Sequence, residues 1–205
     1  SSDLLYLTYP TANKTNAYDF LIPWMDSTLP NNLLWLTLIQ ADSSLHAAEP
    51  EIMESWSVSD DGLTITMTMQ DGLLWSDGTP ITMEDVVWSI EKFAKEEGNY
   101  WAYVVSALRY IKGQEAWKNG ETDTLEGLSY EGNTLTIELS QPYASFLDLM
   151  CQIAPLPKHV YENVPFADDA FRVDEIWREI PVNSGPFVVT EHVEGNYFVL
   201  EPNPC

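Results

Sequence analysis

The chain has 205 residues, of which 32 are Asp or Glu and 9 are Lys or Arg, so its formal net charge is −23. Phosphate recognition requires clustered cations, so this balance excludes a surface that binds nucleic acid or an anionic membrane. Hydrophobic residues make up 45% of the chain and aromatic residues 12%, which is enough apolar surface for a packed core despite the charge.

The N-terminal part of the chain predicts a strand, a loop and a compact apolar block. Leu4 to Tyr9 is a short apolar run that stops at a proline, which suits an initial strand. Residues 11–26 are rich in turn formers and predict a loop. The block Leu33 to Ile39 is too short for periodicity to separate a helix from a buried strand, and Pro30 and Asn31 before it favour a helix.

A β-hairpin with one solvent-exposed face is predicted next. Trp56 to Ser59 and Leu63 to Met69 flank the turn formers Asp60-Asp61-Gly62. The second run alternates threonine with Leu, Ile and Met, which is the period of a half-buried strand.

Thr82 to Lys95 predicts a helix that follows the turn Ser76-Asp77-Gly78-Thr79-Pro80. The Thr82 hydroxyl can cap the helix, and Asp85, three residues on, completes a Thr-x-x-Asp capping box. At helical spacing, one face carries Val86, Ile90, Phe93 and Ala94.

Helices and strands continue to alternate through the rest of the chain. The next predicted elements are a partly helical segment from Asn99 to Trp117, which ends near Asn119-Gly120, and a strand from Thr134 to Leu139. They are followed by a short helix from Tyr143 to Met150 and by two final strands, Phe187 to Glu191 and Tyr197 to Leu200. Mixed elements with several hairpins indicate an α/β or α+β protein with antiparallel pairing.

The sequence offers no motif for metal, nucleotide or nucleophilic chemistry. The three histidines, His46, His159 and His192, are isolated and no HExxH is present, so no metal site is predicted. GxGxxG, GxxxxGK[ST] and GxSxG are absent as well, so no cofactor and no catalytic residue is predicted. A pair of carboxylates for glycoside hydrolysis stays open, because two such groups can come from any part of a chain with 32 acids.

The cysteine pattern and the hydropathy narrow the possible class of protein further. Cys151 and Cys205 are far apart, form no CxxC motif and are compatible either with two separate thiols or with one disulfide in an oxidising compartment. No run approaches the roughly 18 apolar residues that a membrane-spanning helix needs.

Eight tryptophans are the most unusual compositional feature. For most of them, such as Trp56, Trp88 and Trp177, burial under loops or against helices is the simplest role. A minority, Trp24 with Met25 and Tyr100 with Trp101, predicts the lining of a ligand cleft.

Two adjacent stretches, Glu49 to Met67 and Gly72 to Ile90, resemble the signature of the family 5 extracellular solute-binding proteins, the oligopeptide- and dipeptide-binding receptors of ABC importers. The part of this signature that is specific to the family is the run Trp-Ser-Asp-Gly-Thr-Pro-x-Thr-x-x-Asp-Val, which begins at Trp75. Further matches follow in family order at Asn133 to Leu139, Gln141-Pro142, Pro155 to His159, Val182 to Phe187 and Leu200 to Pro204. The loop Val182 to Phe187 is similar to the family's Gly-Thr-Gly-Pro-Tyr loop.

The resemblance implies a periplasmic-binding-protein-like α/β fold whose second lobe is missing from an N-terminal fragment. The first lobe is expected at residues 1–28 and 150–205, discontinuous and incomplete, with a smaller inserted α+β subdomain at residues 29–149. The turn Trp75 to Pro80 is expected to be scaffold, with Asp77-Gly78 making the turn and Thr82 capping the helix.

The resemblance also implies a non-catalytic receptor that captures peptides between two lobes and delivers them to permease subunits. The expected ligand contacts are Trp24, Met25, Asp26, Tyr100, Trp101, Ser184 and Gly185. The receptor is expected outside the cytoplasmic membrane, either periplasmic or attached through a lipid anchor that this chain lacks. Alternatives are the same scaffold with a nickel complex, haem or an oligosaccharide as cargo, or a carboxylate-pair hydrolase.

Overall fold

The structure is a computed structural model of residues 1–205, and it describes residues 33–44, 46–95, 107–163, 182–193 and 197–205. The chain forms two compact units. Unit 1 comprises Ser1–Leu36, Leu74–Thr79 and His159–Cys205, and unit 2 comprises Thr37–Leu73 and Pro80–Lys158. The predicted lobe and subdomain stay predictions, because a compact unit of this chain is not a lobe of a whole receptor.

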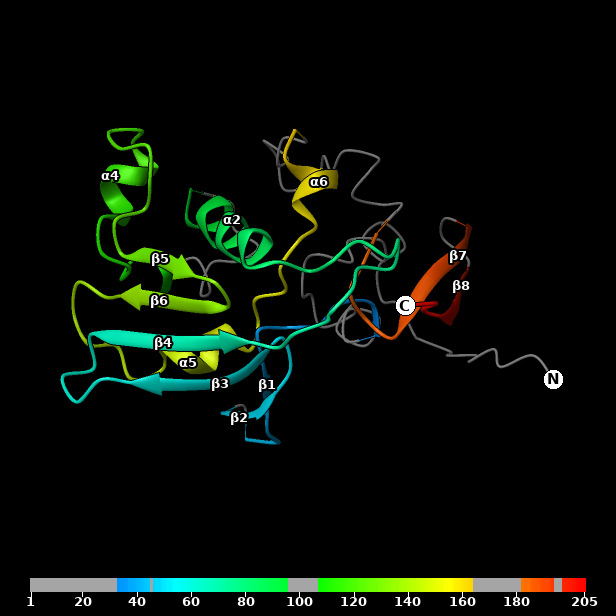
Figure 1. Ribbon diagram of the computed structural model, residues 1–205, viewed down its shortest axis with the longest axis horizontal. Coiled ribbons are helices and arrows are strands. Elements are labelled where there is room, and N and C mark those ends of the chain that lie inside the picture. Colours follow the sequence, from blue (N-terminus) through cyan, green and yellow to red (C-terminus); the bar gives the residue numbers. More distant parts are fainter. Residues whose placement is uncertain (1–32, 45, 96–106, 164–181, 194–196) are drawn as a thin grey trace. The chain divides into compact units, whose positions relative to one another are not determined.

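The centre of unit 2 is a four-stranded antiparallel sheet with strand order β3-β4-β6-β5 (Figure 1). The strands are β3 (Met53–Val58), β4 (Thr64–Met69), β5 (Leu128–Glu131) and β6 (Thr134–Glu138). In the register of β4 and β6, Ile65 pairs with Ile137 and Met67 with Leu135, so apolar side chains meet on one face. These four side chains are at most 1% exposed and form the core of the sheet.

The predicted hairpin is confirmed, including its solvent-exposed face. Strands β3 and β4 pair antiparallel, and Ile65, Met67 and Met69 are buried while the threonines between them are partly exposed. The turn is closed by Asp61, whose Oδ1 accepts hydrogen bonds from the Ser59 hydroxyl at 2.6 Å and the Leu63 N–H at 3.0 Å. Gly62 has a φ of 68°, which L-residues with a side chain rarely adopt.

Helix α2 (Met83–Lys95) begins where the capping box predicts. The Thr82 N–H and hydroxyl donate to Asp85 Oδ2 at 2.9 and 2.7 Å, and the Asp85 N–H donates back to the Thr82 hydroxyl at 3.3 Å. This reciprocal pair satisfies the main-chain N–H groups of Thr82 and Asp85 at the start of the helix. Its predicted apolar face is buried, at Val86, Ile90, Phe93 and Ala94.

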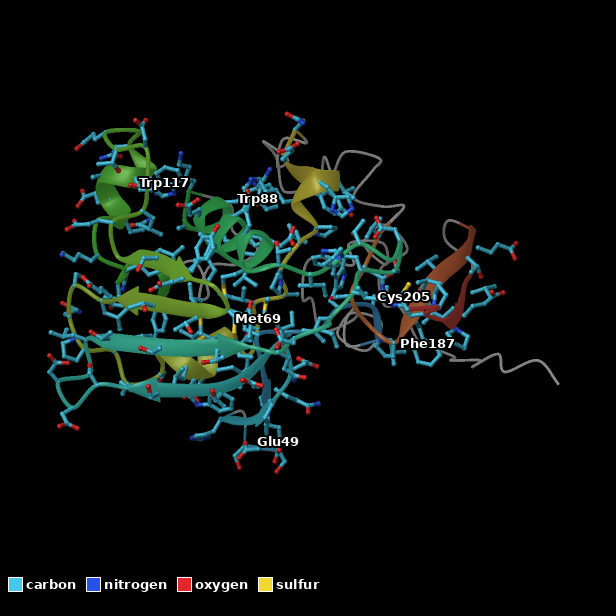
Figure 2. The ribbon with its side chains drawn as sticks, in the orientation of Figure 1. Glu49, Met69, Trp88, Trp117, Phe187 and Cys205 are labelled. Atoms are coloured by element: carbon cyan, nitrogen blue, oxygen red, sulfur yellow. The ribbon has the colours of Figure 1, made fainter. Side chains whose placement is uncertain are left out.

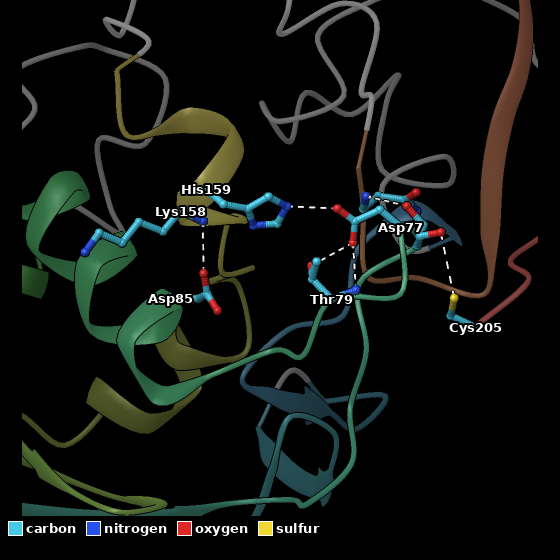
Figure 3. A network of polar contacts seen from close by, with 8 residues as sticks. Asp77, Thr79, Asp85, Lys158, His159 and Cys205 are labelled. Atoms are coloured by element: carbon cyan, nitrogen blue, oxygen red, sulfur yellow. Dashed lines mark hydrogen bonds and ion pairs between the residues drawn. The ribbon is translucent and has the colours of Figure 1, made fainter.

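Two buried polar side chains of α2 also hold the segment that leads into α6 (Lys158–Tyr161). The Lys158 N–H donates to Asp85 Oδ1 at 3.0 Å, as Figure 3 shows, and the Leu156 N–H donates to the Ser89 hydroxyl at 2.9 Å. Ser89 in turn donates to the Asp85 carbonyl at 2.7 Å. One helix thus fixes a segment about seventy residues later without any sheet pairing.

The helix predicted over Leu33 to Ile39 is largely wrong. Only Leu33 and Leu34 are helical, and strand β1 (Ile39–Ala41) ends the segment by pairing with β2 (Ala47–Pro50). Between them, the main chain bonds to distant residues, because the Thr37 N–H donates to Glu51 Oε2 at 2.7 Å and the Leu38 N–H donates to the Ile153 carbonyl at 2.9 Å. These long-range bonds replace the intrahelical ones.

The remaining predictions are confirmed where the structure describes them. The segment predicted to end near Asn119-Gly120 contains α4 (Gln114–Lys118), whose C-cap is Asn119, and residues 96–106 lie outside the described ranges. The short helix is α5 (Phe146–Met150), and the last strands are β7 (Phe187–Val193) and β8 (Tyr197–Pro202), which pair antiparallel in unit 1. The predicted mixed α/β class is confirmed, whereas the strand Leu4 to Tyr9 lies outside the described residues.

Burial is the main role of the tryptophans that the structure describes. Trp75 is 0% and Trp35 4% exposed, and Trp56 is half-buried beside Met67. Trp88 and Trp117, labelled in Figure 2, are half-buried under lysines, with Lys95 Nζ 3.5 Å from the Trp117 ring centroid. Trp177 lies outside the described residues.

Neither cysteine forms a disulfide, since Cys151 and Cys205 are both free thiols. Burial, together with the nearby charge of Asp148, raises the pKa of Cys151 to about 11, so this thiol is not activated. Within the described ranges, no helix combines the length and apolar character needed to span a membrane.

Candidate functional site

Ser184 and Gly185 are the predicted ligand contacts that lie in the described part of the chain. The others, Trp24, Met25, Asp26, Tyr100 and Trp101, lie outside the described residues. The candidate site is therefore built from residues 182–186, which we name the 182–186 loop. It precedes β7 in unit 1.

The 182–186 loop is tied to the main chain of residues 34–36. The Leu36 N–H donates to the Ser184 hydroxyl at 2.9 Å, and the Gly185 N–H donates to the Leu34 carbonyl at 2.8 Å. Ser184 is only 5% exposed. Its hydroxyl is thus engaged inside unit 1.

Gly185 is required by close packing of main chain against main chain. A Cβ at this position would lie 2.4 Å from the Leu34 carbonyl carbon and 2.5 Å from the Leu33 carbonyl oxygen. Real Cβ contacts essentially never fall below 3.0 Å. The φ of Gly185 is not positive, so the requirement here is space and not backbone conformation.

Asn183 sits at the centre of the network and is 1% exposed. Its Nδ2 donates to the Leu34 carbonyl at 2.6 Å and the Phe187 carbonyl at 2.7 Å. Its main chain pairs with Ser76, because the Asn183 N–H donates to the Ser76 hydroxyl at 3.0 Å and the Ser76 N–H donates to the Asn183 carbonyl at 2.9 Å. One residue therefore connects three segments that are distant in the sequence.

Asn203 holds the other side of the loop. Its Nδ2 donates to the Gly185 carbonyl and its N–H donates to the Pro186 carbonyl, both at 2.8 Å. Both main-chain polar groups of Gly185 are therefore engaged within unit 1.

The sequence did not identify Asn183, Asn203 or Ser76 as members of this network. A usable signal was present, because short amides beside Ser, Gly and Pro commonly bond to main-chain groups. That signal names the donors but not their partners.

The turn Trp75 to Pro80 has the scaffold contacts predicted for it. Asp77 Oδ1 accepts hydrogen bonds from the Thr79 N–H at 2.9 Å and the Thr79 hydroxyl at 2.7 Å, and Gly78 has a φ of 84°. Asp77 Oδ2 lies 2.9 Å from Nε2 of His159, as Figure 3 shows. The turn is thus held by its own side chains and by α6.

The Asp77 contacts predict loss of stability in acid. Burial alone raises the pKa of Asp77, but the two hydrogen bonds from Thr79 and the His159 contact outweigh it and hold the pKa below 3.8. The ionised carboxylate is therefore favoured by folding, and its contribution is present above pH 3.8 and lost as the pH falls through the lowered value.

We expect wild type to melt at a higher temperature than Asp77→Asn at pH 6, with the difference shrinking below pH 3.8. Thermal melts of both proteins from pH 6 to pH 3 measure it. An equal difference at pH 6 and pH 3 would contradict the assignment.

The described residues contain no group of three or more His, Cys, Asp or Glu side chains placed to hold a metal ion. The arrangement around residues 182–186 consists of internal hydrogen bonds and close packing of main chain against main chain.

Comparison with known proteins identifies relatives along nearly the whole chain. The model of the bacterial extracellular solute-binding proteins, family 5 Middle, matches residues 47–205. The oligopeptide-binding protein AppA of Bacillus subtilis is 30% identical over 177 residues, which cover 86% of this chain and 30% of AppA. The chain thus spans about a third of the length of the curated relatives that it matches.

Solved structures show the same fold. A periplasmic oligopeptide-binding protein, OppAIV of Borrelia burgdorferi, superposes with a TM-score of 0.73 at 28% identity, over 92% of this chain and 37% of that one. NikZ of Campylobacter jejuni, solved in complex with Ni(L-His), has a TM-score of 0.61 at 24% identity, over 84% of this chain and 30% of NikZ.

Proposed function

The chain belongs to the bacterial extracellular solute-binding proteins, family 5, and from this we propose that its full-length protein captures oligopeptides outside the cytoplasmic membrane. We propose that it delivers them to the permease subunits of an ABC importer. The observation that carries the proposal is the family match over residues 47–205. The relatives AppA and OppA of Bacillus subtilis, both named oligopeptide-binding proteins, support peptides as cargo.

Capture is proposed to occur by closure of two lobes around the solute, with this chain contributing one side. The proposed contacts are Trp24, Met25, Asp26, Tyr100 and Trp101, and Ser184 and Gly185 are proposed to belong to the same site. A peptide receptor gains most of its affinity from main-chain hydrogen bonds, so its side-chain pockets tolerate many sequences. The proposed role is therefore binding without turnover.

The test titrates the full-length protein with pools of synthetic peptides of different lengths and follows its melting temperature. A ligand at about 100 times its dissociation constant adds about 2.7 kcal/mol to the free energy of unfolding, so a bound pool is expected to raise the melting temperature clearly. Parallel titrations use the Ni–histidine complex, haem and oligosaccharides, because this scaffold also occurs in NikZ. A shift with one of these and with no peptide pool would contradict peptide cargo.

The same samples separate a receptor from a hydrolase. Peptides recovered from the protein are expected to have their original masses. Cleaved peptides or glycosides, with turnover abolished by a single carboxylate substitution, would overturn the receptor assignment.

A further inference from the structure

We propose that the 182–186 loop is a positioning loop, in which the Ser184 hydroxyl holds the main chain of residues 34–36 and does not itself contact the solute. This inference rests on the proposed function, because positioning affects binding only in a protein that binds a solute. It also departs from the family resemblance, which places Ser184 and Gly185 directly against the ligand.

The hydrogen bonds of the loop converge on one short segment. The Leu34 carbonyl accepts from both Asn183 Nδ2 at 2.6 Å and the Gly185 N–H at 2.8 Å, and the Leu36 N–H donates to the Ser184 hydroxyl at 2.9 Å. Three successive loop residues therefore each make a bond to residues 34–36. The bonds fix both the direction of the carbonyl at Leu34 and that of the N–H at Leu36.

Burial leaves the side chains of Val182, Asn183 and Ser184 little surface for a solute, whereas Pro186 at the end of the loop is exposed. Asn183 is 1% and Ser184 5% exposed, and on the partner segment Leu34 is 0% and Trp35 4% exposed. The missing Cβ of Gly185 allows the loop to lie directly on the main chain of Leu33 and Leu34. This packing brings the Ser184 hydroxyl within reach of the Leu36 N–H.

The loop is itself held on both sides, as a positioning element requires. Ser76 makes two bonds to the main chain of Asn183, and Asn203 bonds to the carbonyls of Gly185 and Pro186. Buried hydrogen bonds with both partners satisfied favour a single arrangement of the chain. Displacement of residues 34–36 would therefore leave several buried polar groups without partners.

The consequence for binding follows from how peptide receptors work. Main-chain hydrogen bonds to an extended peptide depend on the exact direction of the receptor's own N–H and C=O groups. Residues 34–36 follow Trp24, Met25 and Asp26 in the sequence, which are proposed contacts. A loosened segment is expected to weaken peptide binding even though no atom of Ser184 touches the peptide.

The test compares Ser184→Ala and Ser184→Thr in the full-length protein, with the peptide pool that binds wild type as the probe. Ser184→Ala is expected to speed amide hydrogen exchange of residues 34–37 about tenfold and to weaken peptide binding about tenfold. Ser184→Thr keeps the hydroxyl, and threonine is the corresponding residue of the similar family loop Gly-Thr-Gly-Pro-Tyr. This substitution is therefore expected to restore both the wild-type exchange rate of residues 34–37 and the wild-type affinity for peptide. If Ser184→Ala does not fold, Ser76→Ala takes the place of that variant in the comparison, because it removes one hydrogen bond to Asn183.

Ser89→Ala is the matched control. Ser89 is also a buried serine, at 0% exposed, and its hydroxyl likewise accepts a distant N–H at 2.9 Å, from Leu156, but it lies in unit 2. It is expected to lower the melting temperature without changing exchange at residues 34–37 or the affinity for peptide.

Each remaining outcome decides the matter. Weaker binding by Ser184→Ala with unchanged exchange at residues 34–37 would mean a direct ligand contact and overturn the proposal. An unchanged affinity would overturn it as well, whether or not exchange at residues 34–37 becomes faster. If wild type binds none of the peptide pools, the proposed function fails, and the exchange measurement alone then decides whether the loop holds residues 34–36.

Discussion

Replacing Gly185 by alanine is expected to lower the free energy of unfolding of the full-length protein by about 3 kcal/mol. The added Cβ would lie 2.4 Å from the carbonyl carbon and 2.7 Å from the carbonyl oxygen of Leu34. These are main-chain atoms that cannot rotate away, so the loop and residues 33–34 must separate. Urea unfolding followed by circular dichroism measures the loss.

Gly120→Ala is the matched control for this substitution. Gly120 has a φ of 71°, and a Cβ added there would have nothing within 4 Å, so alanine meets backbone strain without steric overlap. We expect a loss of about 1 kcal/mol. If Gly185→Ala costs no more than Gly120→Ala, the loop does not lie against the main chain of Leu34.

Replacing Asp85 by alanine is expected to cost about 3 kcal/mol as well. Asp85 is 6% exposed, and its carboxylate accepts three hydrogen bonds, from the N–H and hydroxyl of Thr82 and from the Lys158 N–H. Alanine removes the cap of α2 and the attachment of α6 at once. Asp85→Asn keeps one carbonyl acceptor and is expected to show an intermediate loss in the same urea experiment.

Glu84→Gln tests whether charge alone explains the effect of Asp85. Glu84 is the adjacent acid and forms an ion pair with Lys158 Nζ, but its side chain is 61% exposed. Exposed ion pairs contribute little, so we expect a loss below about 0.5 kcal/mol. Equal losses for Glu84→Gln and Asp85→Ala would contradict the role of buried hydrogen bonds at Asp85.

Local sequence patterns were sufficient wherever the residues of an element carry a signal of their own, such as a cap or a regular alternation of apolar and polar side chains. The capping box at Thr82 and Asp85 places the start of α2, and the alternation from Leu63 to Met69 places β4 and its buried face. The short strand β5 was not predicted, because only Leu128 of its four residues is buried. It exists because it pairs with β6.

The candidate site shows the limit of the same reasoning. The residues Asn183, Ser184 and Gly185 were visible in the sequence as a loop similar to one in the family. Their buried contacts with Leu34, Leu36 and Ser76 were not visible, since nothing local relates the two segments.

The sequence by itself determined the mixed α/β class, the capped helix, the hairpin and the family, because caps, turns and hydrophobic periods act over a few neighbouring residues. Only the tertiary structure decided that Leu33 to Ile39 is not one helix, and that the Ser184 hydroxyl accepts a hydrogen bond from the Leu36 N–H. The physical reason is that buried main-chain groups must find partners, and the choice among distant partners depends on the folded arrangement as a whole.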